Sequence, residues 1–303
     1  VFNVMVYTLF ANSIRSEEAE SGGRSSLEDD MSELGETHIQ EIQDDLANIL
    51  LTSDAVILVL TLVVSYALSR RTLAPLEDAY QKQARFIADA AHELRTPLAA
   101  MQAGSEVILR SGRTQDEYTR FIQENLEEVR RLTTLSNDLL FLARHKRPNT
   151  LPMSLVPLSE LCAKRAGAMQ AYASAKGASI TSRIEDGLHV MGAGDDLVRL
   201  LDNLLKNAID YNKTGGSVAL LLQKKSGNVV VSVEDTGIGM HQKDIPRIFE
   251  RFYKASTSRT QNASGTGLGL AMVKEIVEAH RGSISARSVP AEGTTIEVTL
   301  PAH

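Results

Sequence analysis

Two runs of apolar residues near the start of the chain predict membrane-spanning helices. The first covers residues 1–11, and because the chain begins at Val1 rather than Met, we expect it to be part of a longer span. The second, taken as residues 49–69, reaches the roughly 20 residues that a spanning helix needs. Arg70 and Arg71 follow it directly, which is typical of a cytoplasmic flank. A buried core helix is the alternative for the second run.

The residues between these two runs, 12–48, are strongly acidic. From Glu17 to Asp45 the only basic residue is Arg24. Such a charge run favours a solvated, loosely structured segment, with the sensing of a cation or a peptide as the alternative. If both apolar runs span, this segment lies outside the cell, and everything after Arg70 lies in the cytoplasm beneath the cell membrane.

After a short linker expected at 70–84, the apolar positions take a helical period. They recur every three or four residues, which places them in one stripe along a helix: Ile87, Ala90, Ala91, Leu94 and Leu98. His92 lies two positions from both Ala90 and Leu94, or about 200° around the helix. The pattern therefore predicts that His92 is displayed away from the stripe.

A break at 111–114 precedes a second helix whose apolar residues have near-heptad spacing. They are Tyr118, Ile122, Leu126, Val129, Leu132, Leu135, Leu139 and Leu142. Two such helices form a hairpin, and two hairpins can form a four-helix bundle. We therefore expect residues 85–147 to be a dimerisation module and the protein to be a homodimer.

Beyond a linker at 146–150, helical and strand periods alternate. The pattern predicts helices at 159–176, 195–211 and 268–279, and strands at 218–222, 229–233 and 295–300. This mixture favours an α/β sandwich at 152–303, with helices on one face of a sheet. The predicted fold is thus a helical hairpin followed by an α/β sandwich, with a transmembrane helix before both.

Composition narrows the choice of function. No basic stripe interleaved with aromatic residues is present, so nucleic acid is not an expected partner. The single cysteine, Cys162, excludes an intramolecular disulfide and a cysteine-based zinc cluster, and its helical setting predicts an ordinary buried side chain.

Five motifs follow one another in the chain. They are His92-Glu-Leu-Arg-Thr96-Pro97, Asn203-Leu-Leu-Lys-Asn207, Asp235-Thr-Gly237-Ile-Gly239, Phe249-Glu-Arg-Phe252-Tyr253 and Gly265-Thr266-Gly267-Leu268-Gly269. With this order and spacing, residues 83–301 resemble the membrane-bound sensor histidine kinases of bacterial two-component systems. The resemblance implies a histidine phosphoacceptor domain and an ATP-binding domain with the fold shared by gyrase. It also implies an activity: the kinase phosphorylates its own histidine from ATP, and a response regulator takes the phosphoryl group onto an aspartate.

The resemblance makes His92 the phosphorylated residue. A neutral imidazole can attack the γ-phosphorus of ATP, and Glu93 can accept the proton of its second nitrogen. In the family, an arrangement like Glu93-Leu-Arg-Thr96 also supports dephosphorylation of the regulator. Pro97 removes a backbone donor, and we expect the helix to bend just past the site.

The C-terminal motifs are expected to hold the nucleotide. A carboxylate such as Asp235 can accept the exocyclic amino group of adenine, while Gly237 and Gly239 let the backbone approach the base. Asn203 and Asn207 lie four positions apart on one helix, and an amide oxygen suits Mg²⁺, for which Asn207 is the better candidate. The resemblance places Tyr211 in the same pocket.

The segment between Tyr253 and Gly265 is polar and is expected to form a mobile cover over the nucleotide. Phe252 could anchor it, and Lys254, with Arg251 as a further candidate, could reach the phosphates. The glycine motif then opens a helix whose N-terminus can bind phosphate, which adds Gly265, Thr266, Gly267, Leu268 and Gly269 to the expected site. The Glu292-Gly-Thr-Thr295 segment is interpreted as a structural turn rather than a contact.

Two departures from the family pattern are visible. Asp210 stands where relatives commonly have a basic residue, which would weaken ATP binding unless Lys206 or Lys213 compensates. The stretch 72–91 is too short for the complete HAMP signalling domain that many relatives carry.

Two alternatives to a histidine kinase are an ATPase of the same nucleotide fold and a non-catalytic dimeric scaffold. Phosphate retained on the protein would exclude the ATPase, and measured ATP binding would exclude the scaffold.

Overall fold

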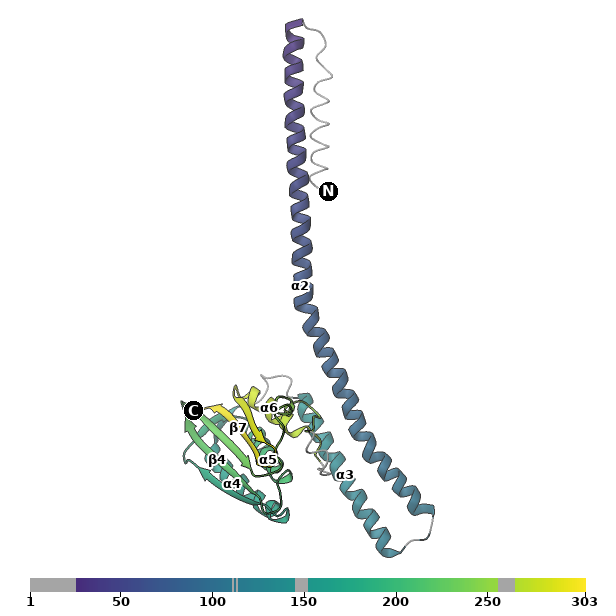
Figure 1. Ribbon diagram of the computed structural model, residues 1–303, viewed down its shortest axis with the longest axis vertical. Helices are drawn as coiled ribbons and strands as arrows, with labels where there is room; N and C mark the ends of the chain where they lie inside the picture. The colour runs from purple at the N-terminus through teal and green to yellow at the C-terminus, as the bar shows by residue number, and fades with distance from the viewer. Residues whose placement is uncertain (1–25, 111, 113, 145–151, 256–264) are drawn as a thin grey trace. The chain divides into compact units, whose positions relative to one another are not determined.

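The computed structural model describes residues 26–110, 112, 114–144, 152–255 and 265–303. It divides into two compact units, 1–84 and 85–303. One long helix, α2 (Ser26–Arg110), belongs to both units (Figure 1). It continues through the expected linker at 70–84 and past Pro97, where a bend rather than an end of the helix was expected.

In the first unit, α2 carries the apolar run that was expected to span a membrane. The stretch His38–Leu73 is long and apolar enough to do so by length and composition, and none of its most apolar window is buried. Thr52 and Thr61 donate their hydroxyl hydrogens to the carbonyls of Asn48 and Ile57, four residues earlier. These bonds satisfy the hydroxyls within the helix itself, as an apolar environment requires. The span expected at 1–11 lies outside the described residues.

The expectation of a loosely structured acidic segment is wrong for residues 26–48, which are helical. Two features of the sequence explain the difference. Glutamate is a good helix former, and apolar residues recur at Ile39, Ile42 and Leu46 with helical spacing. His38 and Glu41, three positions apart, also lie within 3.5 Å of each other on the helix surface.

In the second unit, the end of α2 and α3 (Gln115–Arg144) form the expected hairpin. A capping box starts α3: the Thr114 hydroxyl accepts the backbone N–H of Glu117, and the Glu117 carboxylate accepts the backbone N–H of Thr114. This reciprocal pair fixes where the second helix begins, next to the predicted break.

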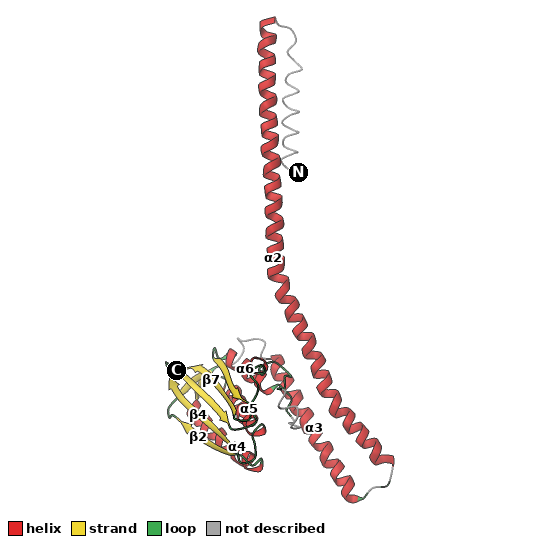
Figure 2. Cartoon of the chain, in the orientation of Figure 1, coloured by secondary structure: helices red, strands yellow, loops and turns green. Residues whose placement is uncertain are grey.

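The rest of the second unit is an α/β sandwich, as predicted. Five strands form a mixed sheet in the order β2-β4-β5-β7-β6, in which only β2 and β4 are parallel, while β1 and β3 pair separately. The strands are β1 (Ser154–Pro157), β2 (Ser179–Ile184), β3 (His189–Gly192), β4 (Ser217–Lys225), β5 (Asn228–Asp235), β6 (Ser283–Val289) and β7 (Gly293–Pro301). Three helices cover one face of the sheet (Figure 2), namely α4 (Leu158–Ala175), α5 (Gly194–Asp210) and α6 (Gly269–Ala279).

The core of this domain lies between the helices and the sheet. Residues of α5 alternate with a helical period between buried and accessible, and Leu197, Leu201 and Leu205 are completely buried. Buried and accessible residues also alternate along the first part of β4 and along β7, which is the pattern of a sheet with one covered face. Cys162 is buried on α4, as expected, and burial raises the pKa of its thiol to about 12.

Candidate functional site

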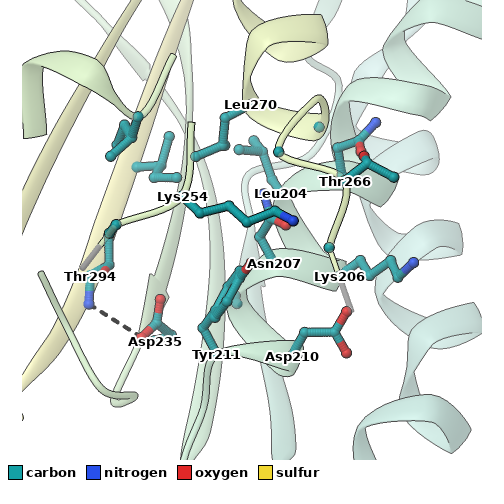
Figure 3. Close-up of a pocket in the computed structure, with 18 of the residues that line it drawn as sticks. Leu204, Lys206, Asn207, Asp210, Tyr211, Asp235, Lys254, Thr266, Leu270 and Thr294 are labelled. Atoms are coloured by element: carbon teal, nitrogen blue, oxygen red, sulfur yellow. Dashed lines mark hydrogen bonds between the residues drawn. The ribbon is translucent and has the colours of Figure 1, made fainter. Parts of the chain in front are cut away.

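A cavity of about 520 Å³ opens in the second unit between α3, α5 and the loops that follow β5. Most of the residues expected to hold the nucleotide line it: Asn203, Asn207, Tyr211, Asp235, Gly239, Lys254, Gly265, Thr266, Gly267 and Gly269. In Figure 3, Asp235 and Thr294 lie at one end of the cavity, Lys206 and Asp210 lie at the other, and Lys254 extends across it above Asn207.

Asp235 lies at the end of β5, where the chain leaves the sheet. Its Oδ1 accepts two backbone N–H groups, from Gly237 at 2.8 Å and from Thr294 at 3.2 Å. Burial raises the pKa of this carboxyl from 3.8 to about 6, although the two N–H donors act in the opposite direction. The carboxylate is thus held in one orientation at the wall of the cavity, and its Oδ2 has no hydrogen bond among those found for the described residues.

The turn at 292–295 is more than the structural connection that the sequence suggested. Thr294 lines the cavity and supplies one of the two donors that hold Asp235. Gly293, just before it, packs against the backbone of Asp235 and has a φ of +138°, a conformation that side chains rarely tolerate. The turn therefore orients the carboxylate that is expected to recognise adenine.

Three residues of the expected site lie beside the cavity without lining it. Gly237 packs against the backbone carbonyl of Tyr211, which leaves no room for a side chain. Leu268 is completely buried in the core. Phe252 has a left-handed backbone with φ of 61°, and its N–H donates to the carbonyl of Gly267 at 2.9 Å. These residues support the backbone that forms the cavity wall, but they do not line the cavity themselves.

The aromatic motif fixes the base of the segment expected to cover the nucleotide. The ring of Phe252 lies 5.9 Å from that of Phe86 on α2. Arg251 stacks on the same Phe86 ring and pairs with Glu275 at 2.7 Å, and it does not line the cavity. Lys254, directly after the motif, is the cation that lines it. Residues 256–264 of the cover lie outside the described residues.

Asn203 and Asn207 point into the cavity from α5, as their spacing predicted. The Asn203 amide nitrogen donates to the carbonyl of Arg199 at 2.8 Å, and its oxygen faces the start of α6 at Gly269. The Asn207 amide makes no hydrogen bond among those found for the described residues. The described residues hold no cluster of three acidic, histidine or cysteine side chains that could bind a metal ion. A metal in this cavity would therefore depend on one amide oxygen together with phosphate and water oxygens. Mg²⁺ commonly binds in that way, so the residues fit it.

Asp210 lines the cavity but faces α4. Its Oδ1 accepts the Tyr172 hydroxyl at 2.5 Å, and Lys176 lies 3.9 Å away. Burial and the neighbouring Asp210 carboxylate both raise the pKa of Tyr172, so its hydroxyl keeps its proton and remains a donor. Of the two lysines considered as compensation, Lys206 lines the cavity and Lys213 is not among the lining residues.

His92 is exposed on α2, as predicted, and does not line the cavity. The Thr96 hydroxyl donates back to the His92 carbonyl at 3.2 Å. Glu93, however, is linked to the cavity: its carboxylate lies 3.6 Å from the Lys254 ammonium and 3.9 Å from the Arg131 guanidinium. Both cations line the cavity.

The sequence interpretation missed a whole wall of the cavity, which belongs to α3. Glu127, Arg131, Thr134 and Asp138 line it, at intervals of three or four residues. Polar residues at this spacing predict a polar face on α3. The sequence analysis considered only the apolar positions of this helix and did not identify that face. Burial raises the pKa of Asp138 to about 6, while the charges of Arg199 and Lys206 oppose the shift. Arg199 also stacks on Phe141 of α3, at 4.5 Å from the ring centre.

Two family models match the chain. Residues 82–148 match the His Kinase A (phospho-acceptor) domain, and residues 192–303 match the histidine kinase-, DNA gyrase B- and HSP90-like ATPase. Sensor histidine kinase CusS of Escherichia coli is 36% identical over 75% of this chain and 47% of its own length. The chain thus spans about half the length of this curated relative.

Solved structures agree with the fold. Full-length ShkA in complex with AMPPNP is 25% identical, covers 72% of this chain and 46% of its own, and has a TM-score of 0.54. Histidine kinase ThkA in complex with response regulator protein TrrA is 17% identical, covers 78% of this chain and 65% of its own, and has a TM-score of 0.61, which shows the fold alone. The two family matches, the curated relatives and the geometry of the cavity place this chain among the two-component sensor histidine kinases.

Proposed function

We propose that this protein is a membrane-bound homodimeric kinase that phosphorylates its own His92 from Mg-ATP and passes the phosphoryl group to an aspartate of a response regulator. One observation carries the proposal. The cavity that collects the expected nucleotide-binding residues is linked, through Lys254 and Arg131, to the carboxylate next to His92. The ATP analogue bound to ShkA supports the choice of ATP as the substrate.

The proposed reaction forms one bond and breaks another. One imidazole nitrogen of His92 attacks the γ-phosphorus, the bond to the bridging oxygen breaks, and ADP leaves. Glu93 accepts the proton of the other ring nitrogen, which prevents a positive charge from building up on the ring as the phosphoramidate forms. Asp235 would hold the adenine through its Oδ2, and Asn207 would hold Mg²⁺, which neutralises phosphate charge in such transfers.

The proposed dimer rests on apolar side chains that a single chain leaves uncovered. On the hairpin, Ile87, Leu98, Ile122 and Leu126 are all about half exposed or more. They fall on the stripes that predicted a four-helix bundle, and a second copy would cover them. The proposed partner for phosphotransfer is a response regulator, as in the ThkA–TrrA complex, and the proposed anchor is the apolar part of α2.

The proposal is tested by incubating the full chain, in detergent or nanodiscs, with magnesium and γ-labelled ATP. We expect label on the protein that is acid-labile and alkali-stable, and we expect His92→Gln to remove it while ATP binding persists. Label that survives in His92→Gln would move the acceptor elsewhere. Label released entirely as free phosphate would favour the ATPase alternative, and failure to bind ATP would favour the scaffold.

A second activity, dephosphorylation of the regulator, is proposed for Thr96, which lies one turn after His92 with its hydroxyl at the helix surface. Thr96→Ala should leave autophosphorylation intact and slow the loss of phosphate from the regulator. Thr119→Ala is a matched control, because Thr119 makes the same bond to a carbonyl four residues earlier on α3. Equal dephosphorylation rates in all three proteins would remove this activity.

A further inference from the structure

The carboxylate of Glu93 lies between two cations that face the nucleotide cavity. Lys254 approaches Oε1 at 3.6 Å, and Arg131 approaches Oε2 at 3.9 Å. The two cations come from different elements that line the cavity, Lys254 from the base of the cover segment and Arg131 from α3. The residue next to His92 is therefore held by the same side chains that would meet a bound nucleotide.

The charges around the cavity make these two cations important. Among the described residues that line it, six are acidic and three are basic. The basic ones are Arg131, Lys206 and Lys254, and the position where relatives commonly have a further cation is Asp210. A triphosphate entering this cavity needs the few cations present, and two of the three are paired with Glu93.

We propose that Arg131 and Lys254 exchange Glu93 for the triphosphate of ATP, so that nucleotide binding releases the carboxylate beside His92. Arg131 is then a positioning residue of α3 for autophosphorylation. The inference rests on the proposed function, because it assigns the triphosphate to the cavity already described. It adds an internal competitor for the two cations: Glu93, the proposed proton acceptor, stays paired with them until ATP is bound.

The geometry suits an exchange. The two pairs are long, and the side chains of Glu93, Lys254 and Arg131 are 25%, 27% and 36% exposed, so each pair contributes little. A phosphate carries more charge than a carboxylate and can accept two parallel hydrogen bonds from a guanidinium, so it is the stronger partner.

A second carboxylate would keep Arg131 at the cavity after Glu93 leaves. Glu128 Oε2 lies 4.0 Å from Arg131 Nη1, one helical turn away on α3. This oxygen is buried and accepts no hydrogen bond within the described part of the chain. Because Glu128 and Arg131 belong to the same helix, their pairing does not depend on the position of Glu93.

The inference is tested by calorimetry of ATP and adenosine binding, with magnesium, to the full chain and its variants. Glu93→Gln removes the competitor and should tighten ATP binding about two- to fivefold, the range of a partly exposed ion pair. Arg131→Gln should weaken ATP binding, and in that background Glu93→Gln should gain less than it does alone. Arg131→Lys keeps the charge and should restore much of the gain. Adenosine binding should not change in any of these variants.

Arg130→Gln is the matched control, since Arg130 is the exposed neighbour on the same helix and does not line the cavity. It should leave the affinity for both ligands unchanged. Unchanged or weaker ATP binding by Glu93→Gln would overturn this inference but not the proposed function. An Arg131→Gln variant that loses ATP and adenosine binding equally would have the same consequence. A wild-type protein that binds no ATP would instead overturn the proposed function, together with this inference.

Discussion

The ATP-binding domain and the α2–α3 hairpin bury their apolar side chains in different ways. In the ATP-binding domain, residues such as Leu204, Leu220 and Val231 are at most 1% exposed within a single chain. In the hairpin, Ile122 is 63% exposed and Leu98 is 53% exposed. The comparison shows that the ATP-binding domain buries its core within one chain, whereas the hairpin leaves apolar side chains uncovered that the proposed second copy would cover.

The largest expected effect comes from disrupting the proposed dimer interface of the hairpin. Ile122→Glu places a charge on the uncovered stripe of the hairpin. A fully buried isoleucine contributes about 1.5–3 kcal/mol and a dimer loses two of them, so the dissociation constant should rise at least about 100-fold. Sedimentation of the purified protein measures this. The adjacent polar residue provides the control, Gln123→Glu, which should remain dimeric; a dimeric Ile122→Glu would contradict the proposed interface.

The next effect tests whether one chain holds the nucleotide through Asp235. Asp235→Asn should weaken adenosine binding about 10- to 100-fold, since a hydrogen bond to a charged group contributes about 1.5–3 kcal/mol. Glu234→Gln, which changes the neighbouring carboxylate, is the control, and an unchanged affinity in Asp235→Asn would count against the role in adenine recognition.

The same carboxyl predicts a pH dependence. Its pKa is raised to about 6, so the carboxylate form that accepts the adenine amino group predominates above that pH and is lost as the pH falls below it. Adenosine affinity should therefore decline below about pH 6 in the wild type. Titration calorimetry between pH 5 and 8, flanking that pKa, measures it. A flat profile in the wild type would show that the ionised form is not required.

A smaller effect concerns the stability of the ATP-binding domain. His280 is buried, and its Nε2 accepts the Ala193 N–H at 3.0 Å while Nδ1 lies 2.7 Å from the Ile276 carbonyl. His280→Ala leaves a buried donor without a partner and should cost about 1–3 kcal/mol in urea unfolding. His241→Ala, at an exposed histidine, should cost much less; equal costs would contradict this reading.

The smallest effect sharpens the account of Asp210. Tyr172→Phe removes the 2.5 Å hydrogen bond that holds this carboxylate toward α4 and should cost about 0.5–1.5 kcal/mol of stability. A freed Asp210 carboxylate should also weaken ATP binding more than adenosine binding. Calorimetry with both ligands measures the difference, and an equal loss would mean that Asp210 does not face the phosphates when released.

Sequence patterns predicted those parts of the fold whose burial repeats with a clear period. Helix α5 and strands β4 and β5 were predicted within a few residues, because one face of each is apolar. Strands β2 and β6 were missed, since both lie at the edges of the sheet and alternate polar residues, such as Ser179-Ile-Thr-Ser-Arg-Ile184, with few apolar ones.

The candidate site was predicted where a motif is local and missed where tertiary contact builds it. Asn207 and Asp235 were predicted from motifs that carry their own spacing, and both line the cavity. The wall formed by α3 and the link from Glu93 to Lys254 depend on how the hairpin and the ATP-binding domain meet, which no local pattern encodes. Asp210 was recognised as a departure, but its hydrogen bond to Tyr172, 38 positions earlier, required the structure.

The most direct test is to locate the phosphate itself. The purified full chain, incubated with magnesium and ATP and kept at alkaline pH, can be digested and sequenced by electron-transfer tandem mass spectrometry. The account predicts one phosphoramidate, on His92, which disappears in His92→Gln. Phosphate on a different residue, or none on a chain that demonstrably binds ATP, would contradict it.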